Sequence, residues 1–97
     1  MGKVRIIGGT LRGRMIAFPE VAGLRPTPDR VRETLFNWIA PQLAGSRCLD
    51  LFAGSGVLGF EALSRGAASV VMMDNHSQVI TQLQNTALAL KCAVDIV

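Results

Sequence analysis

Three glycines and one carboxylate near the middle of the chain have the types and spacing of a nucleotide-binding loop. Gly54, Gly56 and Gly59 follow a short apolar run in G-x-G-x-x-G spacing, and Asp50 lies four residues ahead of the first glycine. Glycine allows a sharp turn and a close approach to a ligand because it has no Cβ. A helix after such a turn offers free N–H groups and the positive end of its dipole to polar ligand atoms. The spacing therefore predicts the ligand loop of a doubly wound α/β fold.

The residues around these glycines predict a strand, a helix and a second strand, which is the context that such a loop requires. Residues 47–52 are predicted to form an apolar strand, and residues 57–65 an amphipathic helix. Residues 69–73 are predicted to form a second strand that ends at Asp74. An acid at this place would hold the hydroxyls of a ribose. A turn that binds no ligand is the alternative, and the presence of all these parts in order disfavours it.

Asp50 distinguishes two classes of ligand. The pyrophosphate of a nicotinamide cofactor would approach this position, and a carboxylate there would repel it. A ligand with a cationic amino-acid end would be attracted instead. The pattern Asp50-x-Phe52-x-Gly54-x-Gly56 resembles the S-adenosylmethionine loop of class I methyltransferases. That resemblance implies a cofactor site formed by Asp50, Phe52, Gly54, Ser55, Gly56, Asp74 and Asn75.

Length and composition indicate one small domain. Ninety-seven residues are few for a complete doubly wound sheet, and a hydrophobic content of 49% disfavours disorder. No apolar run approaches the roughly 18–20 residues of a membrane span, and residues 1–20 lack a signal-peptide core. We therefore expect a soluble, cytoplasmic protein without a metal site, in which Cys48 and Cys92 are buried free thiols.

Positive charge is concentrated in the first half of the chain. Residues 1–47 contain eight Lys or Arg and three Asp or Glu, a net charge of +5, whereas residues 48–97 contain two and four, a net charge of −2. Six arginines lie between residues 5 and 32: Arg5, Arg12, Arg14, Arg25, Arg30 and Arg32. Arginine suits phosphate because its fork of donors can contact two oxygens at once. This distribution indicates a polyanionic partner.

The basic segment is predicted to form a two-stranded ribbon followed by a helix. Residues 4–7 and 15–18 are strand-like runs separated by glycine turns. Thr27 should cap a helix that begins at Pro28 and ends at Pro41. Helical spacing predicts a core face of Val31, Leu35, Trp38 and Ile39, with Arg30, Arg32 and Glu33 on the polar side.

The rest of the chain completes a two-part organisation. Residues 77–90 are predicted to form a helix with an apolar stripe, and residues 93–97 to begin a third strand. We expect a basic ribbon and linker over residues 1–24, and over residues 25–97 the first half of an α/β domain.

Longer segments carry a resemblance to one bacterial family. Residues 24–37 (LRPTPDRVRETLFN), residues 50–59, residues 61–66 (EALSRG) and the opening RIIGGTLRGR of residues 5–14 resemble the small-subunit (16S) rRNA guanine-N2 methyltransferases of the RsmD type. The segment 24–37 is far more specific than the glycine loop. The resemblance implies an incomplete class I, Rossmann-like methyltransferase fold preceded by a β-ribbon.

The resemblance also implies an activity and roles for particular residues. A methyl group would pass from S-adenosylmethionine to the exocyclic amine of a guanine in 16S rRNA or a small-subunit assembly particle. Asp50 would face the methionine end of the cofactor, and Asp74 its ribose. The residues that would close over the methionine end are Arg25, Pro26 and Thr27, and those that would contact RNA are Arg5, Arg12, Arg14 and Arg30.

One part of the family pattern has no match. The catalytic segment of the family, Asn/Asp-Pro-Pro-Phe/Tyr, does not occur in these 97 residues, so we expect no catalytic residue here and no turnover by residues 1–97 alone. An incomplete sheet would expose a strand edge and apolar surface. Such surfaces promote association, and we expect self-association or domain swapping.

Two other functions stay open on the residues alone. A fragment of a nicotinamide-dependent oxidoreductase would also have the glycine spacing and Asp74. A non-catalytic RNA-binding protein would also have the basic segment.

Overall fold

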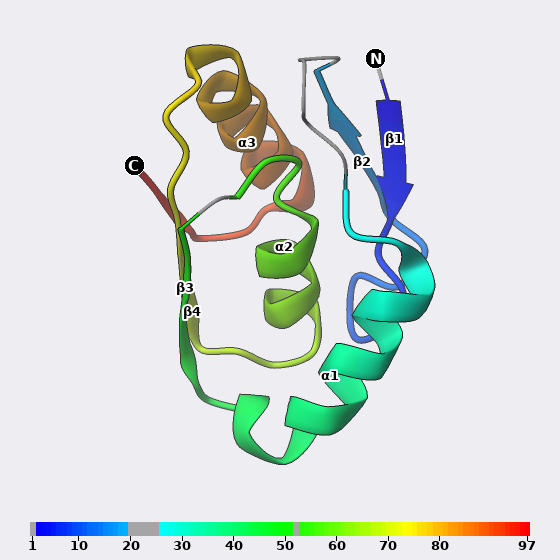
Figure 1. Cartoon of the computed structure of the whole chain (residues 1–97). Helices are drawn as coiled ribbons and strands as arrows, with labels where there is room; N and C mark the ends of the chain where they lie inside the picture. The colour runs from blue at the N-terminus through cyan, green and yellow to red at the C-terminus, as the bar shows by residue number, and fades with distance from the viewer. Residues whose placement is uncertain (1, 20–25, 52) are drawn as a thin grey trace.

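A parallel sheet and an antiparallel ribbon enclose one helix between them. The computed structural model describes residues 2–19, 26–51 and 53–97 (Figure 1). In chain order the elements are β1 (Gly2–Arg5), β2 (Met15–Phe18), α1 (Asp29–Leu43), β3 (Arg47–Asp50), α2 (Val57–Ser64), β4 (Ser69–Met72), α3 (Ser77–Leu90) and β5 (Asp95–Ile96).

The three-stranded sheet has the order β3-β4-β5, and both of its pairings are parallel. Cys48 pairs with Val70, Asp50 with Met72, and Met72 with Ile96. Helices α2 and α3 make the crossovers between successive strands. This is the strand–helix alternation of a doubly wound fold. The ribbon pairs β1 with β2 antiparallel, as the two strand-like runs predicted, but β1 is Gly2–Arg5 rather than residues 4–7, and Val4 lies opposite Ile16.

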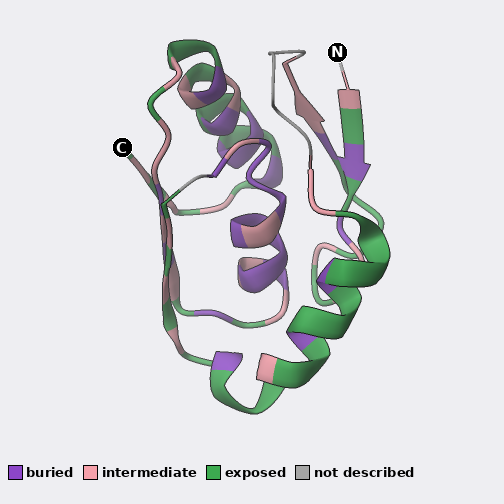
Figure 2. Cartoon of the chain, viewed as in Figure 1, coloured by how far each residue is buried: buried purple, intermediate pink, exposed green. Residues whose placement is uncertain are grey.

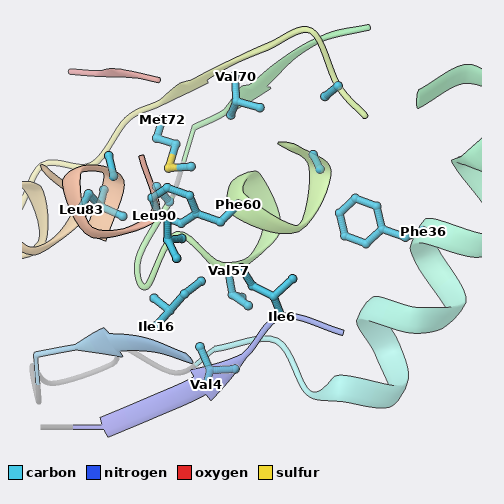
Figure 3. Close-up of a cluster of buried hydrophobic side chains, with 14 of the residues drawn as sticks. Val4, Ile6, Ile16, Phe36, Val57, Phe60, Val70, Met72, Leu83 and Leu90 are labelled. Carbon is cyan, nitrogen blue, oxygen red and sulfur yellow. The ribbon is translucent and has the colours of Figure 1, made fainter. Parts of the chain in front are cut away.

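Helix α2 is buried on nearly all sides because it lies between the sheet and the ribbon (Figure 2). Gly59 faces the sheet, and a Cβ there would overlap Met72. This contact explains the third glycine of the motif as a residue for close helix–strand packing. On the opposite side, Ile6 and Ile16 of the ribbon segment join Phe60 in the core (Figure 3). The predicted division after residue 24 falls among residues that the structure does not describe, and stays a prediction.

The carboxylate of Glu61 connects α2 to the ribbon. Glu61 is fully buried. Its Oε1 accepts a hydrogen bond from the Ile7 N–H at 2.9 Å, and its Oε2 accepts one from the Gly8 N–H at 2.9 Å. Oε2 also accepts from Nε of Arg65 at 2.8 Å, and Nε of the fully buried Arg32 lies 3.9 Å from Oε1.

The predicted core face of α1 is wrong for Val31, Leu35 and Trp38, whereas Ile39 is half-buried against the core. Trp38 is 77% exposed and Val31 is 52% exposed, whereas Arg32, Phe36 and Leu43 are buried. The buried face lies one position away from the face with the most apolar residues, because Arg32 turns inward, where its guanidinium faces Glu61 and bonds the carbonyls of Thr27 and Arg5. Arg32 therefore lies inside rather than on the polar side.

Both predicted ends of α1 also differ from the structure. Pro28, not Thr27, occupies the N-cap position and makes no side-chain capping bond. Pro41 lies inside the helix, which continues to Leu43. The carbonyl that loses its donor at Pro41 belongs to Asn37, and both residues are exposed, so water can satisfy it.

The second half of the chain follows its predicted pattern more closely. Helix α3 spans the predicted residues 77–90, and its buried residues include Val79, Leu83, Ala87 and Leu90. Cys48 and Cys92 are free thiols as predicted, but they are half-buried rather than buried. Burial raises the pKa of Cys92, and the charge of Arg14 partly opposes that rise.

Gly9→Ala should destabilise the fold more than Gly13→Ala, although both glycines lie between β1 and β2 with φ of +81° and +85°. A Cβ at residue 9 would overlap the Ser64 carbonyl, whereas a Cβ at residue 13 would have nothing within 4 Å. Overpacking should lower the free energy of unfolding of Gly9→Ala by about 1–3 kcal/mol beyond that of Gly13→Ala, measured by urea denaturation. Equal losses would show that the left-handed backbone alone requires glycine at both positions.

Candidate functional site

The structure brings Asp50, the glycine loop and Asp74 together at the carboxyl edge of the sheet. Asp50 is the last residue of β3, and Asp74 follows the end of β4 by two residues. The Gly54 N–H donates to Oδ2 of Asp74 at 3.1 Å. The two strand ends are also joined through the backbone, because the Met73 N–H donates to the Asp50 carbonyl at 2.8 Å and the Ala53 N–H to the Met73 carbonyl at 2.9 Å. The motif residues therefore form one cluster.

Left-handed backbone makes the glycine loop. Gly54 has a φ of +54° and Gly56 a φ of +82°, a region that residues with a Cβ rarely adopt. Gly56 is the N-cap of α2, and a Cβ there would lie 2.5 Å from Leu83 and 2.7 Å from Phe60. Packing beneath the loop therefore excludes a side chain at residue 56, independently of any ligand.

Ser55 and Asn75 have different surroundings within this cluster. Ser55 is buried, and its Oγ accepts a hydrogen bond from the Val57 N–H at 3.3 Å, which satisfies one of the free donors at the start of α2. Asn75 is exposed beside Asp74. The side chain of Ser55 thus supports the helix start, and that of Asn75 is accessible from solvent.

Two backbone donors orient the carboxylate of Asp74. Besides the bond from Gly54 to Oδ2, the His76 N–H donates to Oδ1 at 2.9 Å. His76 itself is the N-cap of α3, and its Nδ1 accepts from the Gln78 N–H at 3.3 Å. An ionised carboxylate has about four lone-pair sites, so each oxygen of Asp74 can accept a further hydrogen bond, for example from a ribose hydroxyl. The geometry therefore fits a diol ligand.

Two of the three residues expected at the methionine end lie within the described part of the chain. Pro26 and Thr27 are half-buried just before α1, where Nη1 of Arg32 donates to the Thr27 carbonyl at 2.6 Å. Arg25 and Phe52 lie outside the described residues, so their expected places in the site stay predictions.

The predicted RNA-contacting arginines are all exposed. Arg5, whose side chain is 62% exposed, lies 4.0 Å from a carboxylate oxygen of Asp29, and Arg14 donates to the Ala89 carbonyl at 3.2 Å. Within the described ranges, the side chains of Arg12 and Arg30 make no hydrogen bond or ion pair. These cations are therefore available to an anionic partner.

Two other kinds of feature are absent from the described residues. No group of three or more His, Cys, Asp or Glu is arranged to hold a metal ion in the part of the chain that the structure describes. Nor is any helix in that part long and apolar enough to cross a membrane.

Sequence reasoning missed Glu61 and Arg32, the buried charges that hold the ribbon and α1 in place. A signal was present at Glu61, which is the only charged residue of α2. A lone acid inside an apolar helix needs a buried partner, because an unpaired charge is costly to bury. No comparable local signal marked Arg32.

Comparisons with known proteins show the family to which the chain belongs. A family model described as "Conserved hypothetical protein 95" matches residues 4–97. The chain is 54% identical over 90 residues to "Ribosomal RNA small subunit methyltransferase D" of Escherichia coli K12, covering 93% of this chain and 46% of that protein. It is 53% identical over 92 residues to the protein of the same name from Haemophilus influenzae, covering 95% of this chain and 48% of that protein.

A solved structure named "Putative methyltransferase yhhF from Escherichia coli" aligns with a TM-score of 0.91 and 46% identity, covering 99% of this chain and 52% of that chain. The chain therefore spans about half the length of the relatives it matches. These findings confirm the resemblance drawn from residues 24–37 and the glycine loop, and they confirm the α/β methyltransferase fold class.

Asp74→Ala should loosen the glycine loop even without a ligand. The substitution removes the acceptors of the Gly54 and His76 N–H groups, and a hydrogen bond to a charged group contributes about 1.5–3 kcal/mol. Amide hydrogen exchange at these two residues should therefore accelerate by about tenfold or more relative to the amides of β4. Asp95→Ala, which removes an exposed acid of β5, is the control. Unchanged exchange at Gly54 would show that Asp74 does not organise the loop.

Proposed function

The chain belongs to the family described as conserved hypothetical protein 95, and on that premise we propose that it forms the cofactor-binding part of an S-adenosylmethionine-dependent methyltransferase. The proposed reaction methylates the exocyclic N2 of a guanine in 16S rRNA. The observation that carries the cofactor assignment is the contact of Gly54 with Asp74 beside the end of β3. Two acids flank the left-handed loop in the fold: Asp50 ends β3 ahead of it, and Asp74 follows the end of β4.

The two carboxylates would have separate tasks toward the cofactor. The negative charge of Asp50 would attract the cationic amino-acid end and would repel a pyrophosphate. Asp74 would accept hydrogen bonds from the ribose hydroxyls. S-adenosylmethionine would supply the methyl group to be transferred. The full set of proposed cofactor residues is Asp50, Phe52, Gly54, Ser55, Gly56, Asp74, Asn75, Arg25, Pro26 and Thr27.

The exposed arginines support an RNA substrate. Arg5 ends β1, Arg12 and Arg14 lie in the turn before β2, and Arg30 lies in the first turn of α1. Contacts from these side chains to phosphate would position a structured RNA, while the target base enters the cofactor site. Ribosomal RNA in a bacterial cell would place the protein in the cytoplasm.

Transfer to nitrogen requires that the lone pair of the amine be aligned with the methyl carbon. The Asn/Asp-Pro-Pro-Phe/Tyr segment that the family resemblance assigns to this alignment has no counterpart in residues 1–97. We therefore propose that these residues bind the cofactor without turning it over.

Calorimetric titration tests the cofactor assignment. The chain should bind S-adenosylhomocysteine and not NAD, and Asp50→Ala should weaken that binding by about tenfold, as expected for the loss of a hydrogen bond to a charged group. Asp95→Ala should bind as the unchanged chain does, because Asp95 is an exposed acid on β5. Binding of NAD without binding of S-adenosylhomocysteine would favour the hypothesis of an oxidoreductase fragment. Binding of a 16S RNA helix with neither cofactor would favour a non-catalytic RNA-binding protein.

The edge of the sheet supports the expected self-association. Strand β3 lies at the edge of the sheet, and Leu49 and Leu51 are 62% and 54% exposed. Beside it, an apolar groove of about 330 Å³ lies between α1, α2 and β3 and is lined by residues that include Phe36, Ile39, Leu43 and Leu58. Exposed strand edges and apolar patches promote association between copies. We propose that residues 1–97 associate through this groove.

Leu49→Lys should therefore shift the protein toward monomer in sedimentation velocity, because a charge on an edge strand opposes pairing. Leu88→Lys is a control, since Leu88 is 78% exposed on α3. A chain that sediments as a monomer and unfolds cooperatively without either substitution would contradict self-association. An equal effect of both substitutions would contradict the choice of groove.

A further inference from the structure

Arg32 is a fully buried charge to which the proposed chemistry gives no task. Its guanidinium reaches three segments of the chain. Nη1 donates to the Thr27 carbonyl at 2.6 Å, and Nη2 donates to the Arg5 carbonyl at 2.6 Å and to Oδ1 of Asp29 at 2.8 Å. Its Nε lies 3.9 Å from Oε1 of Glu61 and makes no hydrogen bond within the described residues.

The partners of Arg32 belong to both halves of the proposed site. Thr27 belongs to the segment that would close over the methionine end of the cofactor. Arg5 is the last residue of strand β1, and its exposed side chain is one of the proposed RNA contacts. Arg32 is therefore bonded to the backbone of the cofactor segment and to that of the RNA-contacting ribbon.

An apolar side chain would fill this place at lower electrostatic cost. Burying an ion pair removes two charges from water, and well-packed hydrophobic residues often replace such pairs without loss of stability. What a hydrophobic residue cannot do is bond two carbonyl oxygens of separate segments. A guanidinium can, because its donors form a rigid planar fork, whereas a lysine ammonium is a point charge on a flexible stem.

We propose that Arg32 is a positioning residue for the methyl donor. Its rigid guanidinium donates to the carbonyls of both Thr27 and Arg5, and these bonds fix the position of the segment before α1 relative to the ribbon. Glu61 supplies the negative charge that compensates the buried guanidinium. This inference rests on the proposed function, because it takes residues 26–27 as part of the cofactor site.

Arg65 provides a matched control for this role. It pairs with the same carboxylate, with Nε 2.8 Å from Oε2 of Glu61, and its side chain is 18% exposed. Its guanidinium also lies over the ring of Phe36, 5.3 Å from the centroid. None of its contacts in the described residues is with residues 26–29. Replacing Arg65 thus perturbs the Glu61 cluster and leaves the Thr27 bond intact.

The test compares Arg32→Lys with Arg65→Lys by calorimetric titration with S-adenosylhomocysteine, well below the melting midpoint of each variant. Both substitutions should lower the melting midpoint. Arg32→Lys should also weaken binding by about tenfold, the equilibrium equivalent of one lost hydrogen bond to a charged group. Arg65→Lys should bind as the unchanged chain does. A purely structural role for Arg32 predicts equal affinity in both folded variants, and that result would overturn the inference.

Asp29→Ala keeps the question answerable if Arg32→Lys does not fold. Asp29 accepts a hydrogen bond from Nη2 of Arg32, and its side chain is 54% exposed, so the substitution should be tolerated. Loss of this acceptor should weaken S-adenosylhomocysteine binding severalfold, whereas Glu33→Ala, which removes an exposed acid one turn later, should not. Unchanged affinity in Asp29→Ala would contradict the positioning role. If the unchanged chain itself binds no S-adenosylhomocysteine, the proposed function fails and the inference fails with it.

Discussion

The arrangement of the other elements depends on the hydrogen bonds and ion pairs of the buried Glu61 carboxylate. Its two oxygens accept hydrogen bonds from two backbone N–H groups of the ribbon segment and from Arg65, and Arg32 of α1 faces it. Removing one partner of a buried ion pair costs about 3–5 kcal/mol, because the remaining charge stays buried without compensation. That penalty holds the ribbon, α1 and α2 in one relative position and so ties the basic ribbon to the glycine loop.

Around this cluster the two faces of α2 have different tasks. One face packs on β4, where a Cβ at residue 59 would overlap Met72. The other face binds the ribbon through Glu61 and Ser64, whose Oγ accepts from the Leu11 N–H at 2.9 Å and donates to the Gly8 carbonyl. The start of the same helix forms the glycine loop. The glycine loop, the sheet and the ribbon are therefore positioned by a single helix of eight residues.

The parts of the site that were predictable follow from local rules. Gly54 and Gly56 adopt the left-handed backbone that glycine permits, and Asp50 and Asp74 lie at neighbouring strand ends because parallel strands end at the same edge. What could not be predicted is the second task of Gly56, where a Cβ would meet Leu83 of α3, and the pre-orientation of Asp74 by Gly54 and His76. Both depend on contacts between segments that are distant in the chain.

Helix α1 shows most clearly which features the sequence determines and which the tertiary structure decides. The sequence by itself determined that a helix follows residue 28, that a glycine loop joins a strand to a helix, and that cations gather in the first half of the chain, because propensity, spacing and charge are local properties. Only the tertiary structure decided that Arg32 is buried and Trp38 exposed. Apolar periodicity favoured a face one position away, because periodicity takes no account of a carboxylate on another helix. The position that turns inward instead belongs to Arg32, which faces Glu61 and bonds the carbonyls of Thr27 and Arg5.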